Sequence, residues 1–152
     1  MEEIIIKHDI VVKAKKLYDD ASLPEYAHNG DAGADLFSYK NYTIEPGKQA
    51  FVSTGVALAI PYGYEGQVRP RSGLAKKHMI SITNTPGTVD SGYRGEMNVI
   101  LINHGDEPYE IKKGDKIAQI VFKKIEIAKI LEVDNLDNTK RGVGGFGSTG
   151  LR

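Results

Sequence analysis

Turn-forming residues recur at short intervals along most of the chain, and this spacing limits the fold more than any other feature. The turn signals are Pro46-Gly47, Tyr62-Gly63, Pro86-Gly87, Gly105-Asp106 and Gly114-Asp115. Glycine and proline punctuate the backbone at such positions. Short strand-like segments at this regular spacing predict an all-β barrel or double-sheet fold.

Three segments between the turns have the patterns expected of strands. Residues Gln49–Ile60 alternate apolar and small side chains, and Met97–Ile102 forms a second apolar run. Residues Lys116–Val133 begin almost continuously apolar and then continue with period two. One stretch, Ser72–Met79 (SGLAKKHM), predicts a single short helix with Ser72 near its cap.

The apolar pattern ends before the chain does. The 152 residues suit a single domain, and 40% of them are hydrophobic, which is enough for a sizeable core. From Asp134 onward the periodic apolar residues are lost. We therefore expect a β-barrel over residues 1–133 and a flexible, glycine-rich arm over residues 134–152.

Charge and composition exclude several classes of function. The chain has 20 basic and 20 acidic residues, whereas a general nucleic-acid binder would carry a basic excess. It has no cysteine, which excludes disulfides, zinc–thiolate sites and thiol nucleophiles. The acidic N-terminus does not resemble a signal peptide, and no apolar stretch could span a bilayer. We expect a cytoplasmic protein without a membrane partner, or a nuclear one if the source is eukaryotic or viral.

The arm carries a glycine-rich run, RGVGGFGSTG, at residues 141–150. Its glycines satisfy the dinucleotide fingerprint G-x-G-x-x-G, but that fingerprint needs a following helix to receive the phosphates. Too few residues remain to form one, and no Walker A lysine is present. Whatever this run binds, the supporting structure must come from elsewhere.

Four other stretches combine turns with charged, hydroxyl or amide groups. They are DAGADLF from Asp31, RPRSGLA from Arg69, NTPGTVDSGYRGE from Asn84 and GDKIAQIVF from Gly114. Taken singly, each is most simply a hairpin turn, a helix cap or a turn entering a strand. The four histidines are scattered without metal-ligand spacing.

Taken together and in this order, the four stretches and the arm resemble the trimeric deoxyuridine triphosphate nucleotidohydrolases (dUTPases), from about Leu23 to Thr149. The resemblance implies a jelly-roll-like homotrimer that cleaves dUTP to dUMP and pyrophosphate. This activity keeps uracil out of DNA and supplies dUMP for thymidylate synthesis. Asp90 matches the base that activates water for attack at the α-phosphate, and Tyr93 matches the ring that leaves no room for a ribose 2′-hydroxyl.

The resemblance also implies how the base and the phosphates are held. A hairpin from Asn84 to Asn98 would select uracil largely through its backbone, with Gly87, Thr88 and Val89 contributing. Arg71, Ser72, Gly73 and Gln119 match the phosphate ligands. Asp35 matches an acid that holds Mg²⁺ through water, while the triphosphate binds the metal directly.

For the arm, the resemblance implies a lid that crosses to a site built between two other subunits. Phe146 would stack on the uracil, and Arg141 with the amides around Gly147 would meet the γ-phosphate. Ser148 and Thr149 would add hydroxyl donors. Glycines allow successive N–H groups to converge on an anion, and they leave the arm disordered until substrate orders it.

Two other functions are compatible with parts of the same pattern. The dCTP deaminases share the fold but need a glutamate on the strand after the hairpin, and by the spacing from Gly95 that position is Ile100. A nucleotide-sensing module that controls a partner protein would be favoured by loss of Asp90 or of the arm, and both are present. A sensing role in addition to catalysis is compatible with the sequence, and no motif in it indicates a regulatory partner.

Overall fold

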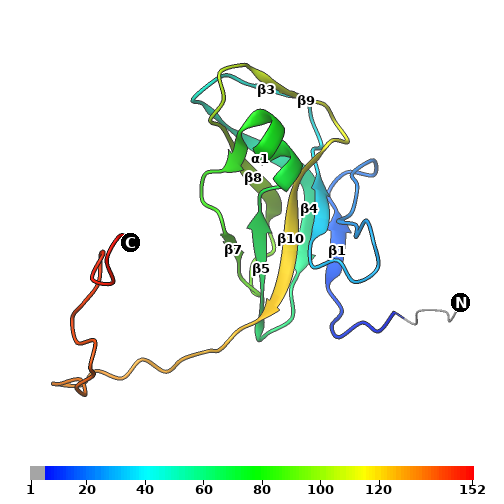
Figure 1. Cartoon of the computed structure of the whole chain (residues 1–152). Coiled ribbons are helices and arrows are strands. Elements are labelled where there is room, and N and C mark those ends of the chain that lie inside the picture. The colour runs from blue at the N-terminus through cyan, green and yellow to red at the C-terminus, as the bar shows by residue number, and fades with distance from the viewer. Residues whose placement is uncertain (1–5) are drawn as a thin grey trace, which may run out of the picture.

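The computed structural model describes residues 6–152 as a body of antiparallel strands followed by a long C-terminal arm (Figure 1). The strands are β1 (Lys13–Lys16), β2 (Ala34–Phe37), β3 (Tyr42–Ile44), β4 (Gln49–Ala59), β5 (Tyr64–Arg69), β6 (Ile80–Ile82), β7 (Gly87–Val89), β8 (Glu96–Asn103), β9 (Tyr109–Ile111) and β10 (Lys116–Lys124). The single helix in this part of the chain is α1 (Ser72–His78).

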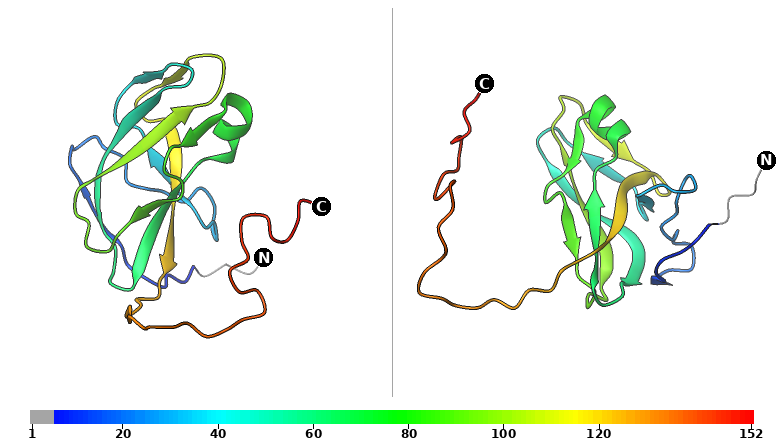
Figure 2. Two further views of the ribbon diagram at one scale, coloured as in Figure 1. Left: turned by 90° about the vertical axis from the view of Figure 1, so that its left-hand side faces the viewer. Right: turned by 60° about the horizontal axis from the view of Figure 1, so that its bottom comes forward.

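Two four-stranded sheets form the body. One has the order β1-β4-β8-β6 and the other has the order β2-β10-β5-β7, while β3 and β9 make a separate pair. The central pairs are β4 with β8, in which Val52 lies opposite Val99, and β10 with β5, in which Ile120 lies opposite Val68. The two sheets face each other across one interior (Figure 2). The predicted all-β fold is confirmed.

The core lies between these sheets, and strand β8 shows by its alternating burial which of its faces turns toward it. Along β8, Met97, Val99 and Leu101 are buried, whereas the residues between them are partly exposed. This period of two matches the pleat of a strand with one face toward the core. The outward positions of β8 thereby remain available to line a surface hollow.

Helix α1 confirms the predicted helical segment and changes one detail. The residue at its N-cap is Arg71, in extended conformation, and no side chain caps the helix; Ser72 is the first helical residue. The helix ends at His78, and its C-cap residue Met79 has a left-handed φ of 54°. It is too short and too polar to cross a membrane, and residues 6–152 contain no other helix.

The last strand ends earlier than its sequence pattern predicts. Strand β10 stops at Lys124, so the period-two residues up to Val133 do not continue it, and the prediction of a strand-like segment to Val133 was wrong. Ile127, Leu131 and Val133 are exposed. From β10 the chain leaves the body and runs well away from it (Figures 1 and 2). Residues 125–133 have no neighbouring strand within the described part of the chain, so their apolar pattern does not lead to a strand.

Candidate active site

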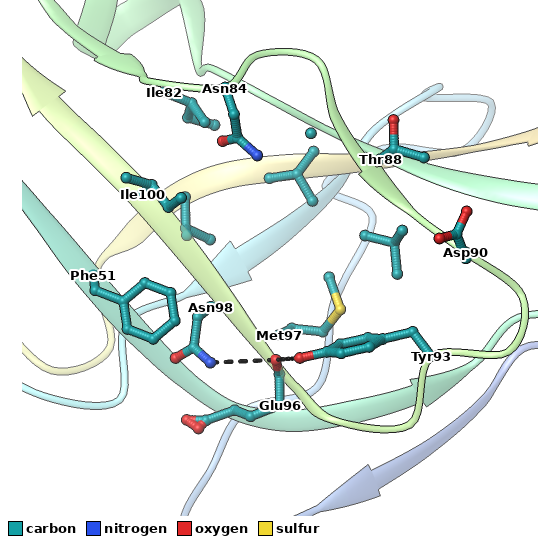
Figure 3. A pocket seen from close by; sticks show the side chains of 14 residues that line it. Phe51, Ile82, Asn84, Thr88, Asp90, Tyr93, Glu96, Met97, Asn98 and Ile100 are labelled. Carbon is teal, nitrogen blue, oxygen red and sulfur yellow. Dashed lines mark hydrogen bonds between the residues drawn. The ribbon is translucent and has the colours of Figure 1, made fainter.

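A first hollow opens between the β7–β8 hairpin and the outer face of β8 (Figure 3). It brings together every predicted base, sugar and catalytic residue of the hairpin: Asn84, Gly87, Thr88, Val89, Asp90, Tyr93 and Asn98. The sequence interpretation did not include the rest of its lining, which is Phe51, Val68, Ile82, Glu96, Met97, Val99 and Ile100. Two of these, Glu96 and Ile100, are outward residues of β8, and strand alternation alone would have indicated them.

Pairing of β7 with β5 places the amide of Asn84 in this hollow. Val68 lies opposite Gly87, and Gly66 lies opposite Val89. A Cβ at Gly87 would approach Asn84 Nδ2 to 3.3 Å and Val68 Cβ to 3.5 Å. Glycine at this position therefore leaves room for the Asn84 side chain, which points into the hollow (Figure 3).

The turn after β7 presents Asp90 and Tyr93 at the opposite side of the same hollow. The Tyr93 amide donates to the Asp90 carbonyl at 3.1 Å. The Tyr93 hydroxyl donates to the Glu96 carbonyl at 2.8 Å, which holds the ring across the hairpin. Within residues 6–152, no hydrogen bond or ion pair engages the Asp90 carboxylate. An ionised, uncommitted carboxylate can accept a hydrogen bond from water.

A second hollow collects the predicted phosphate and metal residues that precede the arm: Asp35, Arg71, Ser72, Gly73 and Gln119. The Asp35 carboxylate is only 13% exposed and lies between two cations. Its oxygens are 3.6 Å from Arg71 Nε and 3.2 Å from Lys116 Nζ. Sequence reasoning missed Lys116, although it is the lysine of the GDKIAQ stretch.

Strand pairing explains why these distant residues meet. In β10, Gln119 lies opposite Asp35 of β2 on one side and opposite Arg69 of β5 on the other. Its side-chain amide donates to the Pro70 carbonyl at 3.1 Å. A Cβ at Gly33 would lie 2.9 Å from Gln119 Cδ, so glycine is needed there for the Gln119 side chain to keep its place.

The predicted arm residues, Arg141, Phe146, Gly147, Ser148 and Thr149, form a third group apart from both hollows (Figure 1). The arm is shaped only by local turns, such as Gly144 N–H to the Arg141 carbonyl at 3.1 Å. Phe146 is fully exposed. The two hollows themselves share no lining residue. One copy of the chain therefore holds the predicted site as three separate parts.

The described residues do not form a metal cage of their own. Among residues 6–152, no three histidine, aspartate or glutamate side chains gather in a position to hold one ion. Asp35 is flanked by two cations, Arg71 and Lys116. This arrangement fits a metal that arrives on an anionic ligand and meets the protein through water.

An all-β body with an amide- and aromatic-lined hollow, and a separate hollow rich in cationic and amide donors, defines a protein suited to a small polar ring carrying anionic groups. A family model described as dUTPase matches residues 19–150. The chain belongs to the dUTPase family. This membership confirms the resemblance drawn from the five sequence stretches, and it does not favour the dCTP deaminase alternative.

Relatives and solved structures agree with this assignment. The chain is 54% identical over 141 residues to a deoxyuridine 5′-triphosphate nucleotidohydrolase of Alkaliphilus metalliredigens, covering 93% of this chain and 98% of that protein. It is 52% identical to the protein of the same name from Clostridium tetani, covering 93% and 98%. Among solved structures, the dUTPase of Staphylococcus bacteriophage 80alpha with dUpNHpp is 31% identical, with a TM-score of 0.85 over 93% of this chain and 99% of that one. A variant dUTPase of S. aureus phage phi11, described as coordinating a structural Mg(II) ion, is 30% identical, with a TM-score of 0.77 over 83% and 98%.

Proposed function

We propose that this chain hydrolyses dUTP to dUMP and pyrophosphate as a homotrimer with Mg²⁺. The observation that carries the proposal is the first hollow, which holds an uncommitted carboxylate, an amide and an aromatic ring together on one hairpin. These are the groups needed to activate water, to recognise a polar nucleobase and to distinguish a deoxyribose from a ribose.

Uracil would be recognised by groups that the β7–β8 hairpin holds rigidly. Uracil offers a donor at N3 and an acceptor at O4, and cytosine reverses both. The Asn84 amide and the backbone of Gly87 to Val89 present fixed partners, because β7 is paired along its length with β5. A wrong base would leave buried groups unpaired, which is the strong form of discrimination.

Catalysis would rest on Asp90. Its carboxylate accepts a hydrogen bond from water, aligns that water with the α-phosphorus, and takes a proton as the new P–O bond forms. The bond between the α-phosphorus and the bridging oxygen then breaks, and pyrophosphate leaves. Positioning and charge stabilisation supply most of the rate enhancement in such a transfer, and a general base adds about 10²- to 10⁴-fold.

The second hollow would bind the triphosphate. Arg71 and Gln119 offer donors, and Ser72 adds a hydroxyl at the start of α1. Mg²⁺ held by the triphosphate would neutralise its negative charge, with Asp35 bonding to the water around the metal. Lys116, paired with Asp35, adds a cation to the same hollow.

A trimer would join the three separated parts of the site. In a ring of identical subunits, one surface of each copy meets a different surface of the next. The first hollow of one subunit could then face the second hollow of its neighbour, and the arm of the third subunit would close over both. The separation of these parts in one chain supports this assembly. We place the enzyme in the cytoplasm, where it would limit dUTP and supply dUMP.

Product analysis tests the proposal directly. The full chain is incubated with Mg²⁺ and, separately, with dUTP, dCTP, UTP and dTTP. The expected result is dUMP and pyrophosphate from dUTP alone. A uracil nucleotide released from dCTP would instead identify a deaminase, despite Ile100. Binding of dUTP without any product would identify a nucleotide-sensing protein.

A further inference from the structure

We propose that Glu96, anchored by Ser53, is a positioning residue that sets the place of Tyr93 and thereby the exclusion of ribonucleotides. This inference rests on the proposed function, because it concerns how the sugar is tested. It gives a role to Glu96 of the first hollow and to Ser53 and Gly95, which line neither hollow.

Tyr93 is held at its hydroxyl end and not by burial. Tyr93 is 46% exposed, so packing alone does not determine the position of its ring. The hydroxyl donates to the Glu96 carbonyl at 2.8 Å, and Asn98 Nδ2 approaches the same oxygen at 3.3 Å (Figure 3). The Glu96 carbonyl oxygen thus accepts hydrogen bonds from both Tyr93 and Asn98 at this end of the hollow.

The position of Glu96 is in turn tied to the body. Its carboxylate accepts a hydrogen bond from Ser53 Oγ, which lies 3.2 Å from Oε2 and closer to Oε1. Ser53 is buried on β4, where its amide donates to the Tyr42 hydroxyl at 2.9 Å and its carbonyl accepts from the Tyr39 amide at 2.8 Å. The pair spans the point where the β4–β8 register shifts, between Ser53 and Ala57.

Ladder pairing is interrupted at that shift, so a side-chain bond there can hold the start of β8 where backbone bonds do not. The Tyr93 hydroxyl donates to the Glu96 carbonyl oxygen, and the position of that oxygen relative to β4 therefore depends on the Ser53–Glu96 hydrogen bond. A ring that excludes one hydroxyl group must be placed closely, since a small displacement opens space for a 2′-oxygen.

Gly95 completes the arrangement. A Cβ at this residue would lie 2.5 Å from the Tyr93 hydroxyl oxygen, 2.7 Å from Cζ and 2.9 Å from Cε2. The φ of Gly95 is not positive, so the backbone itself would accept an alanine. Gly95→Ala should accordingly push the ring and leave the sheet intact. Gly92 is the matched control, because a Cβ there meets nothing within 4 Å and its φ is not positive either.

The test measures the ratio of kcat/KM for dUTP to kcat/KM for UTP, together with Tm. We expect Glu96→Ala, Ser53→Ala and Gly95→Ala to lower the ratio roughly five- to tenfold, which is about what losing one hydrogen bond gives. Glu96→Gln, which retains an acceptor for Ser53, and Gly92→Ala should keep the ratio of the unmodified chain. An unchanged ratio in Glu96→Ala and Gly95→Ala would overturn the proposal, even if Tm falls.

A double-mutant cycle separates positioning from general loosening. The Tyr93→Phe variant lacks the hydroxyl that donates to the Glu96 carbonyl. In that background, Glu96→Ala should change the dUTP-to-UTP ratio of kcat/KM little further. Fully additive effects would contradict a path through Tyr93. If the unmodified chain does not cleave dUTP, the proposed function fails, but the same comparison remains possible with dissociation constants for dUpNHpp and its ribose counterpart. A binding preference for the deoxy analogue that Gly95→Ala and Glu96→Ala abolish would still support the positioning role.

Discussion

Lys116 Nζ lies 3.2 Å from Asp35 Oδ2, so the acid expected to face the metal is already paired with a cation in the chain alone. Arg71 approaches the other oxygen, with Nε at 3.6 Å. Both cations also belong to the hollow assigned to the triphosphate. Arrival of a metal-bearing triphosphate would redistribute these contacts, the carboxylate turning to the hydrated metal and the cations turning to the phosphates.

This arrangement predicts the metal dependence of Asp35→Asn. Because the amide removes the negative charge that attracts the hydrated ion, the Mg²⁺ concentration giving half-maximal turnover should rise several-fold. Titration of Mg²⁺ at fixed dUTP measures it. Asp31→Asn is the control, since Asp31 lines the same hollow but accepts a hydrogen bond from the His28 amide of its own turn at 3.0 Å. An equal shift in both variants would point to bulk charge and not to the position of Asp35.

Asp90→Asn should separate binding from chemistry. The amide retains the shape of the side chain but cannot take a proton from water, so turnover should fall by at least about 10²-fold. Affinity for dUpNHpp should stay within a few-fold, because no contact within residues 6–152 depends on that carboxylate. Steady-state kinetics and calorimetry give the two quantities. Near-normal turnover would remove Asp90 from the role of base.

Deletion of residues 141–152 should impair turnover without weakening the fold. Among the described residues the arm hydrogen-bonds only within its own turns, and Phe146 is fully exposed, so Tm and oligomeric mass should stay as they are in the full chain. Turnover should fall sharply, because the lid and its phosphate donors are missing. Phe146→Ala tests stacking alone and should have a smaller effect. An unimpaired rate after deletion would mean that the arm does not close the site.

A surface cluster far from the proposed chemistry predicts part of the acid sensitivity. Asp20 accepts hydrogen bonds from Lys113 and Tyr39, which lower its pKa to about 2 from an ordinary value of 3.8. A lowered pKa means that this stabilisation is present above about pH 4 and is lost as the pH falls through about 2. Asp20→Asn should therefore have a slightly lower Tm than the unmodified chain at pH 6, and the difference should shrink as the pH falls through about 2. The cluster is exposed, so added salt should shrink the difference. A difference in Tm as large at pH 2 as at pH 6 would exclude the charge as its cause.

Local pattern was enough to predict some elements and not others. The pattern over Gln49–Ile60 predicted β4 nearly to its ends, although the strand is buried on both faces from Val52 to Leu58. The period-two residues after Lys124 have the same kind of pattern, yet they do not continue β10. An alternating pattern indicates which face of a segment is apolar. It does not indicate whether that face packs against the same chain or against another one.

The grouping of the site depended on contacts that are remote in sequence. The stretch containing Asn84, Asp90 and Tyr93 is one hairpin, so its members were certain to lie near one another. Asp35 and Gln119 meet only because β2 and β10 are neighbours in the sheet, and no local signal specifies that order. Lys116 was missed for the same reason, since its role depends on the carboxylate opposite and not on its own turn.

The division of the site among separate surfaces of one chain has a genetic consequence. Each active site of the proposed trimer would take its catalytic base, its phosphate ligands and its lid from different copies of the chain. An Asp90 variant and an arm-deleted variant that are each inactive alone can then restore activity when they assemble together. In mixed trimers some centres would receive an intact Asp90 from one parent and an intact arm from the other. The same logic makes a single defective allele harmful beyond its own share of the protein, because each faulty copy disturbs centres that its neighbours need.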